Sequence, residues 1–231
     1  MENIIFSSAH PDDITGSAGT MLRLKNRYKI HMVDMTRGES GMLREKVSFD
    51  ECAAIRTAEE EAVAKMLNAD LHFLGEKDIF GEGFAGREVC ERAAKLIEEL
   101  KPRAIFLNWP LDVHIDHVMS NAIIFKALDI ATKRSGYDTE LYFHEHTVQT
   151  KGFNPDCFAD ITDVFEERNK LIRLYKCQNR NDFLVTCKTL DARFRGSRCN
   201  VMYAEAFVAF YPEKLRTRPT IFDELAAEKR S

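Results

Sequence analysis

The sequence lacks a long hydrophobic run and a paired cysteine motif. No apolar segment in its 231 residues approaches the roughly 18 residues that a membrane-spanning helix requires. The first apolar stretch, Ile4–Phe6, is too short for a signal peptide, and the six cysteines are scattered without a CxxC pair. These absences argue against a membrane span and a disulfide framework. We therefore expect reduced thiols in a cytoplasmic protein.

A strong net charge is also missing. The chain carries 33 basic and 37 acidic residues, a formal net charge of −4, which gives no electrostatic reason to expect nucleic acid as a partner. Hydrophobic residues make up 45% and charged residues 30%, as is usual for a globular protein. No linker, repeat or low-complexity segment divides the chain. We therefore expect a single domain over residues 1–231.

Apolar strand patterns alternate with helical patterns along the chain, which is typical of a mostly parallel sheet flanked by helices. The sequence therefore predicts an α/β fold, although the order of elements is less clear after Asn179. The expected strands are Ile4–Phe6, Lys29–Met35, Leu71–Leu74, Ala104–Leu107 and Leu141–His144, and Tyr203–Phe207 is expected to return to the body of the domain. The expected helices are Ser17–Arg27, Asp50–Leu67, Val89–Leu100, one starting near His117 and one capped by Thr162.

Two clusters of His and Asp follow two of the expected strands. Residues 9–13 read Ala-His-Pro-Asp-Asp after the first strand, and residues 114–117 read His-Ile-Asp-His after the strand Ala104–Leu107. The polar turn at residues 36–41 follows the second strand and is expected at the same edge. Because chemistry collects beyond the carboxyl ends of strands in an open α/β sheet, these clusters predict one metal site built from distant segments.

A catalytic zinc usually takes three protein ligands, and His10, Asp13 and His117 supply two imidazoles and one carboxylate. Asp12 is then available as a general base, and His114, as an imidazolium, to stabilise an oxyanion. Asp116 is expected to orient His114 and to favour its charged form. Taken alone, each motif is also explained without a metal, because Asp-Asp is common in turns and HxxH often occurs by chance. Their combination at two strand ends favours a metal.

The motifs together resemble the PIG-L/LmbE-like N-deacetylase family. The resemblance implies a Rossmann-like fold and a zinc-dependent enzyme that acts on N-acetylglucosamine-type groups. It implies one Zn²⁺ per chain, with another divalent metal such as Fe²⁺ possible, held by His10, Asp13 and His117, with Asp12 as the base and His114 assisting the transition state. Arg56 would contact the substrate. The segments that carry the resemblance are residues 9–13, 36–39, 56–59 and 114–117, and those resembling the bacillithiol-type branch are residues 153–155, 160–162, 193–196 and 203–205.

One departure from the family pattern concerns the residue after the first motif. The family has a Glu there, whereas this chain has Ile14-Thr15 and a segment that is one residue shorter, so Thr15 is expected to cap the following helix. This departure leaves open a sugar-binding relative that retains the metal but not efficient turnover. A nucleotide-binding domain is a further alternative, for which Gly16 and Gly19 are the only support.

Other positions carry weaker expectations. Glu39 either lines the pocket and contacts substrate or closes a turn. His144 and His146 alternate at a strand end, so both could face the pocket as a rim or a second cation site, although surface histidines are common. The glycine-rich residues 81–86 are either a flexible connection or a rim over the pocket. The expected partner is a small amino-sugar substrate, and the sequence leaves a homo-oligomer open.

Overall fold

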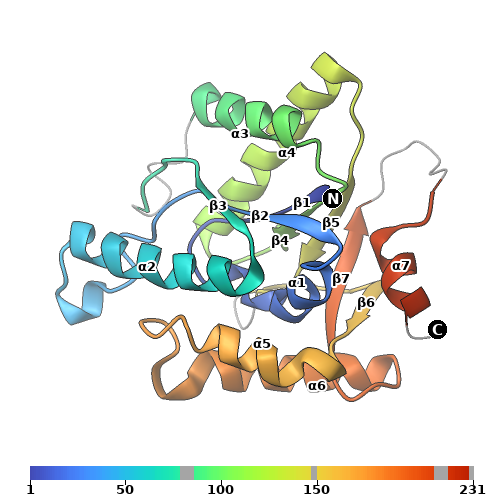
Figure 1. The fold of residues 1–231 in the computed structure, drawn as a ribbon. Coiled ribbons are helices and arrows are strands. Elements are labelled where there is room, and N and C mark those ends of the chain that lie inside the picture. The colour runs from blue at the N-terminus through green and yellow to red at the C-terminus, as the bar shows by residue number, and fades with distance from the viewer. Residues whose placement is uncertain (79–85, 147–149, 211–217, 229–231) are drawn as a thin grey trace.

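A single sheet organises the chain, in a computed structural model that describes residues 1–78, 86–146, 150–210 and 218–228 (Figure 1). The glycine-rich rim predicted at residues 81–86 lies almost entirely outside these residues. Within the described part, seven strands pair in the order β3-β2-β1-β4-β5-β7-β6. The strands are β1 (Glu2–Ser8), β2 (Tyr28–Asp34), β3 (Asp70–Phe73), β4 (Ala104–Asn108), β5 (Glu140–His144), β6 (Cys157–Asp160) and β7 (Ala204–Phe210).

The first five strands run parallel, and only β7 and β6 add antiparallel pairs at one edge. The prediction of a mostly parallel sheet is therefore confirmed. The chain leaves β1 for β2 and β3 on one side and returns to β4 and β5 on the other. The strand order thus reverses between β1 and β4, and in open α/β sheets a crevice forms at the carboxyl ends of such strands. Both His/Asp clusters follow these two strands.

Helices cover both faces of the sheet. In Figure 1, α3 and α4 lie on one face, and α1, α5 and α6 lie on the other. Within the described ranges, no helix is both long and apolar enough to cross a membrane. The helices are α1 (Ala18–Leu24), α2 (Phe49–Leu67), α3 (Arg87–Leu100), α4 (Ile115–Ser135), α5 (Phe165–Ile172), α6 (Phe183–Arg198) and α7 (Ile221–Ala227), with short 3₁₀-helices η1 (Asp13–Gly16), η2 (Leu43–Glu45), η3 (Thr162–Val164) and η4 (Arg180–Asp182).

Alternation of side chains along β1 divides the core into two layers. Ile4 and Phe6 pack into the layer beneath α1 and α5, whereas Ile5 packs into the layer beneath α3 and α4. All three side chains are almost fully buried, and each such burial contributes about 1.5–3 kcal/mol. Burial on both faces explains why the central strands read as continuous apolar runs. All described strands share this one sheet, and we keep the proposal of a single domain.

The second half of the chain departs most from the sequence prediction. The edge strand β6 and the helix α6 were not predicted, because neither has a clear apolar period; α6 carries only scattered buried positions such as Leu184, Val185 and Ala192. The predicted cap at Thr162 is wrong. Thr162 starts η3, its hydroxyl accepts a hydrogen bond from the N–H of Tyr203 at 3.2 Å, and α5 begins three residues later at Phe165.

The predicted cap at Thr15 is also wrong, since Thr15 lies inside η1 and α1 begins at Ala18. A carboxylate from the far end of the chain replaces it: Glu205 on β7 accepts hydrogen bonds from the N–H groups of Gly19 and Thr20 at 2.8 Å each. These two donors are those that a bound phosphate would need at a helix start. The nucleotide-binding alternative therefore loses its only support.

Candidate active site

The loop after β1 folds around one carboxylate. Asp12 adopts a left-handed conformation with φ of 89°, and the next residue, Asp13, starts η1. Asp13 Oδ2 accepts hydrogen bonds from the N–H groups of Ala9 at 3.1 Å and His10 at 3.0 Å. Asn108 at the end of β4 donates to the same oxygen at 3.2 Å. The loop is thus tied to the neighbouring strand, and the Asp13 side chain is fixed at the crevice.

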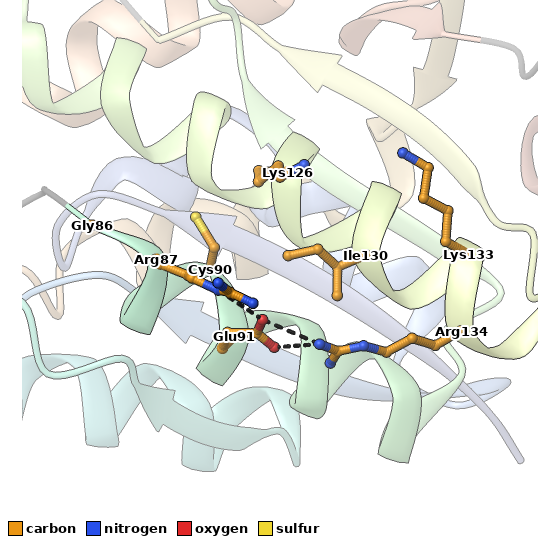
Figure 2. Close-up of a pocket in the computed structure, with 8 residues that line it drawn as sticks. All are labelled: Gly86, Arg87, Cys90, Glu91, Lys126, Ile130, Lys133 and Arg134. Atoms are coloured by element: carbon orange, nitrogen blue, oxygen red, sulfur yellow. Dashed lines mark hydrogen bonds and ion pairs between the residues drawn. The ribbon is translucent and has the colours of Figure 1, made fainter.

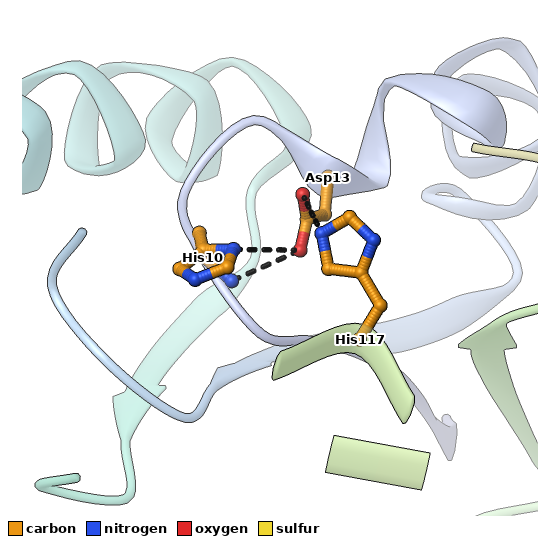
Figure 3. A group of neighbouring side chains, drawn as sticks. All are labelled: His10, Asp13 and His117. Atoms are coloured by element: carbon orange, nitrogen blue, oxygen red, sulfur yellow. Dashed lines mark hydrogen bonds and ion pairs between the residues drawn. The ribbon is translucent and has the colours of Figure 1, made fainter. Parts of the chain in front are cut away.

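The second cluster reaches the same place from the start of α4. His114 precedes the helix, and its Nδ1 accepts a hydrogen bond from the N–H of Asp116 at 3.3 Å. One turn into the helix, His117 Nε2 lies 3.3 Å from Asp13 Oδ1 (Figure 3). One ligand atom each from His10, Asp13 and His117 lies within 4.8 Å of the others, and all three residues are buried. The structure therefore brings together the three predicted metal ligands.

The charge around these residues fits a divalent cation. The carboxylates of Asp13, Asp78 and Asp116 lie 3.3–3.6 Å from the ring nitrogens of His10, and Asp112 Oδ2 lies 3.1 Å from His117 Nδ1. Burial opposes charged rings, yet these carboxylates raise the pKa of His10 well above its usual value and that of His117 to about 9. Such a surplus of buried negative charge is what a metal with imidazole and carboxylate ligands compensates.

Asp12 and Arg56 form a buried pair beside the cluster. Burial raises the pKa of Asp12 to about 6, although the Arg56 guanidinium opposes this shift. A pKa in this range suits a general base that works near neutral pH. Arg56 on α2 is 4% exposed and donates hydrogen bonds to the Asp12 carboxylate and to the carbonyl of Pro11. Arg56 lines the cavity, as expected of a substrate-binding residue, but its guanidinium also pairs with the carboxylate of Asp12.

The expected hydrogen bond between the Asp116 carboxylate and the His114 ring is not found; Asp116 lies nearer to His10. The fully buried Asp116 carboxylate lies 3.3 Å from His10 Nε2 but 3.9 Å from His114 Nδ1, beyond hydrogen-bond range. Burial, with the nearby His10 and His117, lowers the pKa of His114, so the structure does not support a His114 held charged by Asp116. Because His114 Nδ1 accepts the N–H of Asp116, its proton resides on Nε2. The neutral ring is still a hydrogen-bond donor.

Glu39 contacts Asp78, a residue that lines the cavity, rather than the cavity itself. Its carboxylate accepts a hydrogen bond from the N–H of Asp78 at 3.1 Å, and the Asp78 carboxylate in turn accepts one from the N–H of Ser40 at 3.1 Å. Glu39 is not among the described residues that line the cavity. Sequence reasoning missed Asp78 and Asp112. The available signal was their position after β3 and β4, at the sheet edge that carries the motifs.

His144, the last residue of β5, and His146, two residues later, have different surroundings. His146 lines the site cavity, and its Nε2 lies 3.2 Å from Asp13 Oδ1. His144 is fully buried, neither ring nitrogen has a hydrogen-bond partner among the described residues, and burial lowers its pKa to about 3. A side chain at Gly16 would clash with this ring, because its Cβ would lie 2.6 Å from His144 Nδ1. The expectation that both histidines face the pocket therefore holds for His146 only.

A cavity of about 300 Å³ opens above the cluster. Exposed Phe183 and the adjacent Leu184, at the start of α6, form an apolar part of its wall. Ser40, Gly41 and Gln178 also line a neighbouring groove of about 370 Å³, so the two hollows adjoin. A separate hollow of about 640 Å³ lies between α3 and α4, away from the cluster, and several of its charged side chains pair with one another (Figure 2).

Comparison with known proteins agrees with this site. The family model described as PIG-L, GlcNAc-PI de-N-acetylase, matches residues 5–128, which include both His/Asp clusters. The chain belongs to the PIG-L family. Membership identifies an enzyme of the N-deacetylase type, as the sequence motifs predict.

Relatives of this PIG-L family member include enzymes of two kinds. Diacetylchitobiose deacetylase of Thermococcus kodakarensis is 26% identical over 194 residues, covering 79% of this chain and 72% of the relative. The 4-oxalmesaconate hydratase of Pseudomonas putida is 26% identical over 231 residues, covering 89% and 88%. The solved structure of N,N'-diacetylchitobiose deacetylase from Pyrococcus horikoshii matches 90% of this PIG-L chain and 84% of its own, with a TM-score of 0.76 and 26% identity. The narrower bacillithiol-type branch stays a prediction.

Proposed function

We propose that this protein is a metal-dependent hydrolase that removes the acetyl group from an N-acetylglucosamine-type sugar or its glycoside. The reaction adds water across the amide bond and yields a free amine and acetate. His10, Asp13 and His117 would hold the metal, with Zn²⁺ as the first candidate and Fe²⁺ as an alternative. When bound, such a cation acts as a Lewis acid and makes a water molecule acidic enough to attack at neutral pH.

The proton transfers would fall to Asp12. Its carboxylate lines the cavity, and its pKa of about 6 allows it to accept a proton from the attacking water and then to deliver that proton to the departing amine. His114 also lines the cavity, and a neutral ring with its proton on Nε2 would donate a hydrogen bond to the oxygen that becomes negative. Arg56 would hold Asp12 in place.

The lack of an unpaired Lys or Arg among the described residues that line the cavity supports the choice of a neutral substrate. Asp12, Asp13 and Asp78 line it, whereas Arg56 is the only Lys or Arg among its described lining residues and is already paired with Asp12. An uncharged amide enters such a site without charge repulsion, and the product amine becomes a cation that the carboxylates favour. A hydratase is the second candidate because of the Pseudomonas putida relative. The bound cation and Arg56 would offset the three carboxylates, and the described lining offers no further Lys or Arg to bind the carboxylates of an anionic oxo-acid.

The test joins metal analysis to product analysis. The purified protein should bind about one equivalent of Zn²⁺ and release acetate from a panel of N-acetylglucosaminides, N,N'-diacetylchitobiose included. Asp12→Asn, nearly isosteric but unable to accept a proton, should retain the metal and lose turnover by about 10²-fold or more. Hydration of unsaturated oxo-acids, assayed in parallel, is the control. Absence of acetate release from the fully metal-loaded protein, with hydratase turnover present, would contradict the proposal.

A further inference from the structure

The two oxygens of the Asp13 carboxylate have separate roles in this structure. Oδ2 accepts three hydrogen bonds, from the N–H groups of Ala9 and His10 and from the side-chain amide of Asn108, at 3.0–3.2 Å. These three donors belong to the loop and to β4, so they hold the carboxylate in one orientation. Oδ2 therefore has little capacity left for a metal. Oδ1 is the oxygen that remains for ligation.

Two imidazole nitrogens flank that remaining oxygen. His117 Nε2 lies 3.3 Å and His146 Nε2 lies 3.2 Å from Asp13 Oδ1, and the two rings lie with centroids 4.6 Å apart. Zn–N and Zn–O bonds of about 2.0–2.2 Å in a tetrahedral centre place neighbouring ligand atoms about 3.3–3.5 Å apart. The spacing of both nitrogens from Oδ1 is close to this value. His146 Nε2 thus lies as close to Asp13 Oδ1 as His117 Nε2 does.

The ring of His146 is also accessible from the site cavity. The side chain is 12% exposed and lines the cavity, so a cation bound there can reach its ring. A second group of possible ligands, Asp112, His117 and His146, brings the same ring next to His117 within 4.8 Å. The ring comes from the chain just after β5, a third segment beyond the two motifs that the sequence predicts.

We propose that His146 is a fourth protein ligand of the metal held by His10, Asp13 and His117. This inference rests on the metal centre of the proposed function. Three imidazoles and one carboxylate bind a divalent cation more tightly than two imidazoles and one carboxylate. Zinc expands to five ligands, so four protein ligands leave one position for a water molecule or for the substrate oxygen. The alternative role for His146 is to donate a hydrogen bond from Nε2 to Asp13 Oδ1 without touching the metal.

X-ray absorption spectroscopy of the protein loaded with one equivalent of Zn²⁺ separates these roles, because scattering from imidazole rings counts the coordinated histidines. We expect three histidines in the wild type and two in His146→Gln. The zinc dissociation constant, measured by competition with a chelator, should rise about 10–100-fold in the variant. His72→Gln on β3 removes a histidine away from the site and should leave both measurements unchanged.

Two coordinated histidines in the wild type would overturn the proposal, and this measurement needs no variant to fold. A protein that binds zinc through two histidines and releases acetate would retain the proposed function and lose only the fourth ligand. A protein that coordinates zinc through three histidines but releases no acetate would retain the fourth ligand and lose the proposed function. Unchanged zinc affinity in a folded His146→Gln would also count against the fourth ligand.

Discussion

Arg56 donates hydrogen bonds to the carboxylate of Asp12 and to the carbonyl of Pro11, so one guanidinium ties α2 to the loop after β1. Close packing confines this side chain, since a Cβ at Gly38 would lie 2.6 Å from the Arg56 guanidinium carbon. Arg56 is therefore placed to orient the proposed base, rather than only to contact substrate.

The first prediction follows for Arg56→Lys. Both hydrogen bonds come from one guanidinium nitrogen, Nη2, and a lysine retains the charge but has a shorter side chain that does not place its donor at the same point. We expect kcat to fall by on the order of 10²-fold, the scale for a misplaced catalytic group, with little change in KM. Steady-state kinetics of acetate release check this, with the exposed Arg44→Lys as the control. A variant whose KM rises while kcat is retained would show instead that Arg56 mainly binds substrate.

The second prediction concerns His114. Its Nδ1 accepts the N–H of Asp116, which leaves a donor on Nε2 toward the cavity. His114→Phe retains a flat ring without that donor, so kcat should fall by about 10²–10³-fold, the usual cost of losing an oxyanion donor. The zinc content should stay near that of the wild type, because His114 is not among the proposed ligands. A metallated variant with wild-type turnover would exclude His114 from the mechanism.

The first half of the fold was predictable from sequence because its strands are apolar on both faces. Runs such as Ile4–Phe6 and Ala104–Leu107 are buried in both core layers, and the two His/Asp clusters directly follow such runs. Sequence order and the topology of parallel sheets therefore suffice to bring residues 10–13 and 114–117 to one edge. The three proposed metal ligands were found in this way.

The remaining features depend on contacts between distant segments. Glu205 replaces the predicted cap at Thr15 from 190 residues away, a distance in sequence over which local capping patterns carry no information. Asp116 lies closer to His10 than to His114, because the rotation of α4 on the sheet sets where its first turn points. His146 approaches Asp13 from beyond β5. None of these pairings has a local sequence signal.

The third prediction concerns Glu205, which accepts from Gly19, Thr20 and the Thr20 hydroxyl at 2.7–2.8 Å and faces Arg168 at 3.6 Å. Glu205→Ala leaves the buried Arg168 without this carboxylate, and such losses cost about 3–5 kcal/mol. Urea denaturation should therefore show a lower midpoint at an unchanged slope. The exposed Glu166→Ala on α5 is the control and should lose less than about 1 kcal/mol. Equal stabilities for the two variants would contradict the role assigned to Glu205.

The fourth prediction concerns Phe183, which is 54% exposed in the wall of the site cavity. A sugar ring or its aglycone that packs on this side chain would gain about 1–1.5 kcal/mol, so Phe183→Ala should raise KM roughly 5–10-fold with kcat nearly unchanged. Phe194→Ala is a matched control, because Phe194 is on the same helix, is 55% exposed and does not line the cavity. Identical KM values for both variants would show that the substrate does not reach Phe183.

The last prediction concerns the histidine pair on β2 and β3. His31 Nε2 lies 3.1 Å from the side-chain oxygen of Asn3, and His31 Nδ1 lies 3.1 Å from His72 Nε2. With both rings neutral, each donates from Nε2. Burial lowers the pKa of both rings below the ordinary 6.5, with the charge of His72 adding to the effect on His31, while the exposed carboxylate of Asp70 opposes the shift.

A histidine whose pKa is lower in the folded state binds its proton first in the unfolded chain. The contribution of this pair to the free energy of unfolding should therefore be highest above about pH 7 and fall as the pH drops through 6.5, by up to about 1.4 kcal/mol per pH unit for each of the two histidines. His72→Gln retains a hydrogen-bonding amide beside His31 but has no proton to bind. Its stability, measured by urea denaturation between about pH 7.5 and about pH 5.5, should decline less steeply than that of the wild type. Parallel curves for the two proteins would show that the pair does not titrate on unfolding.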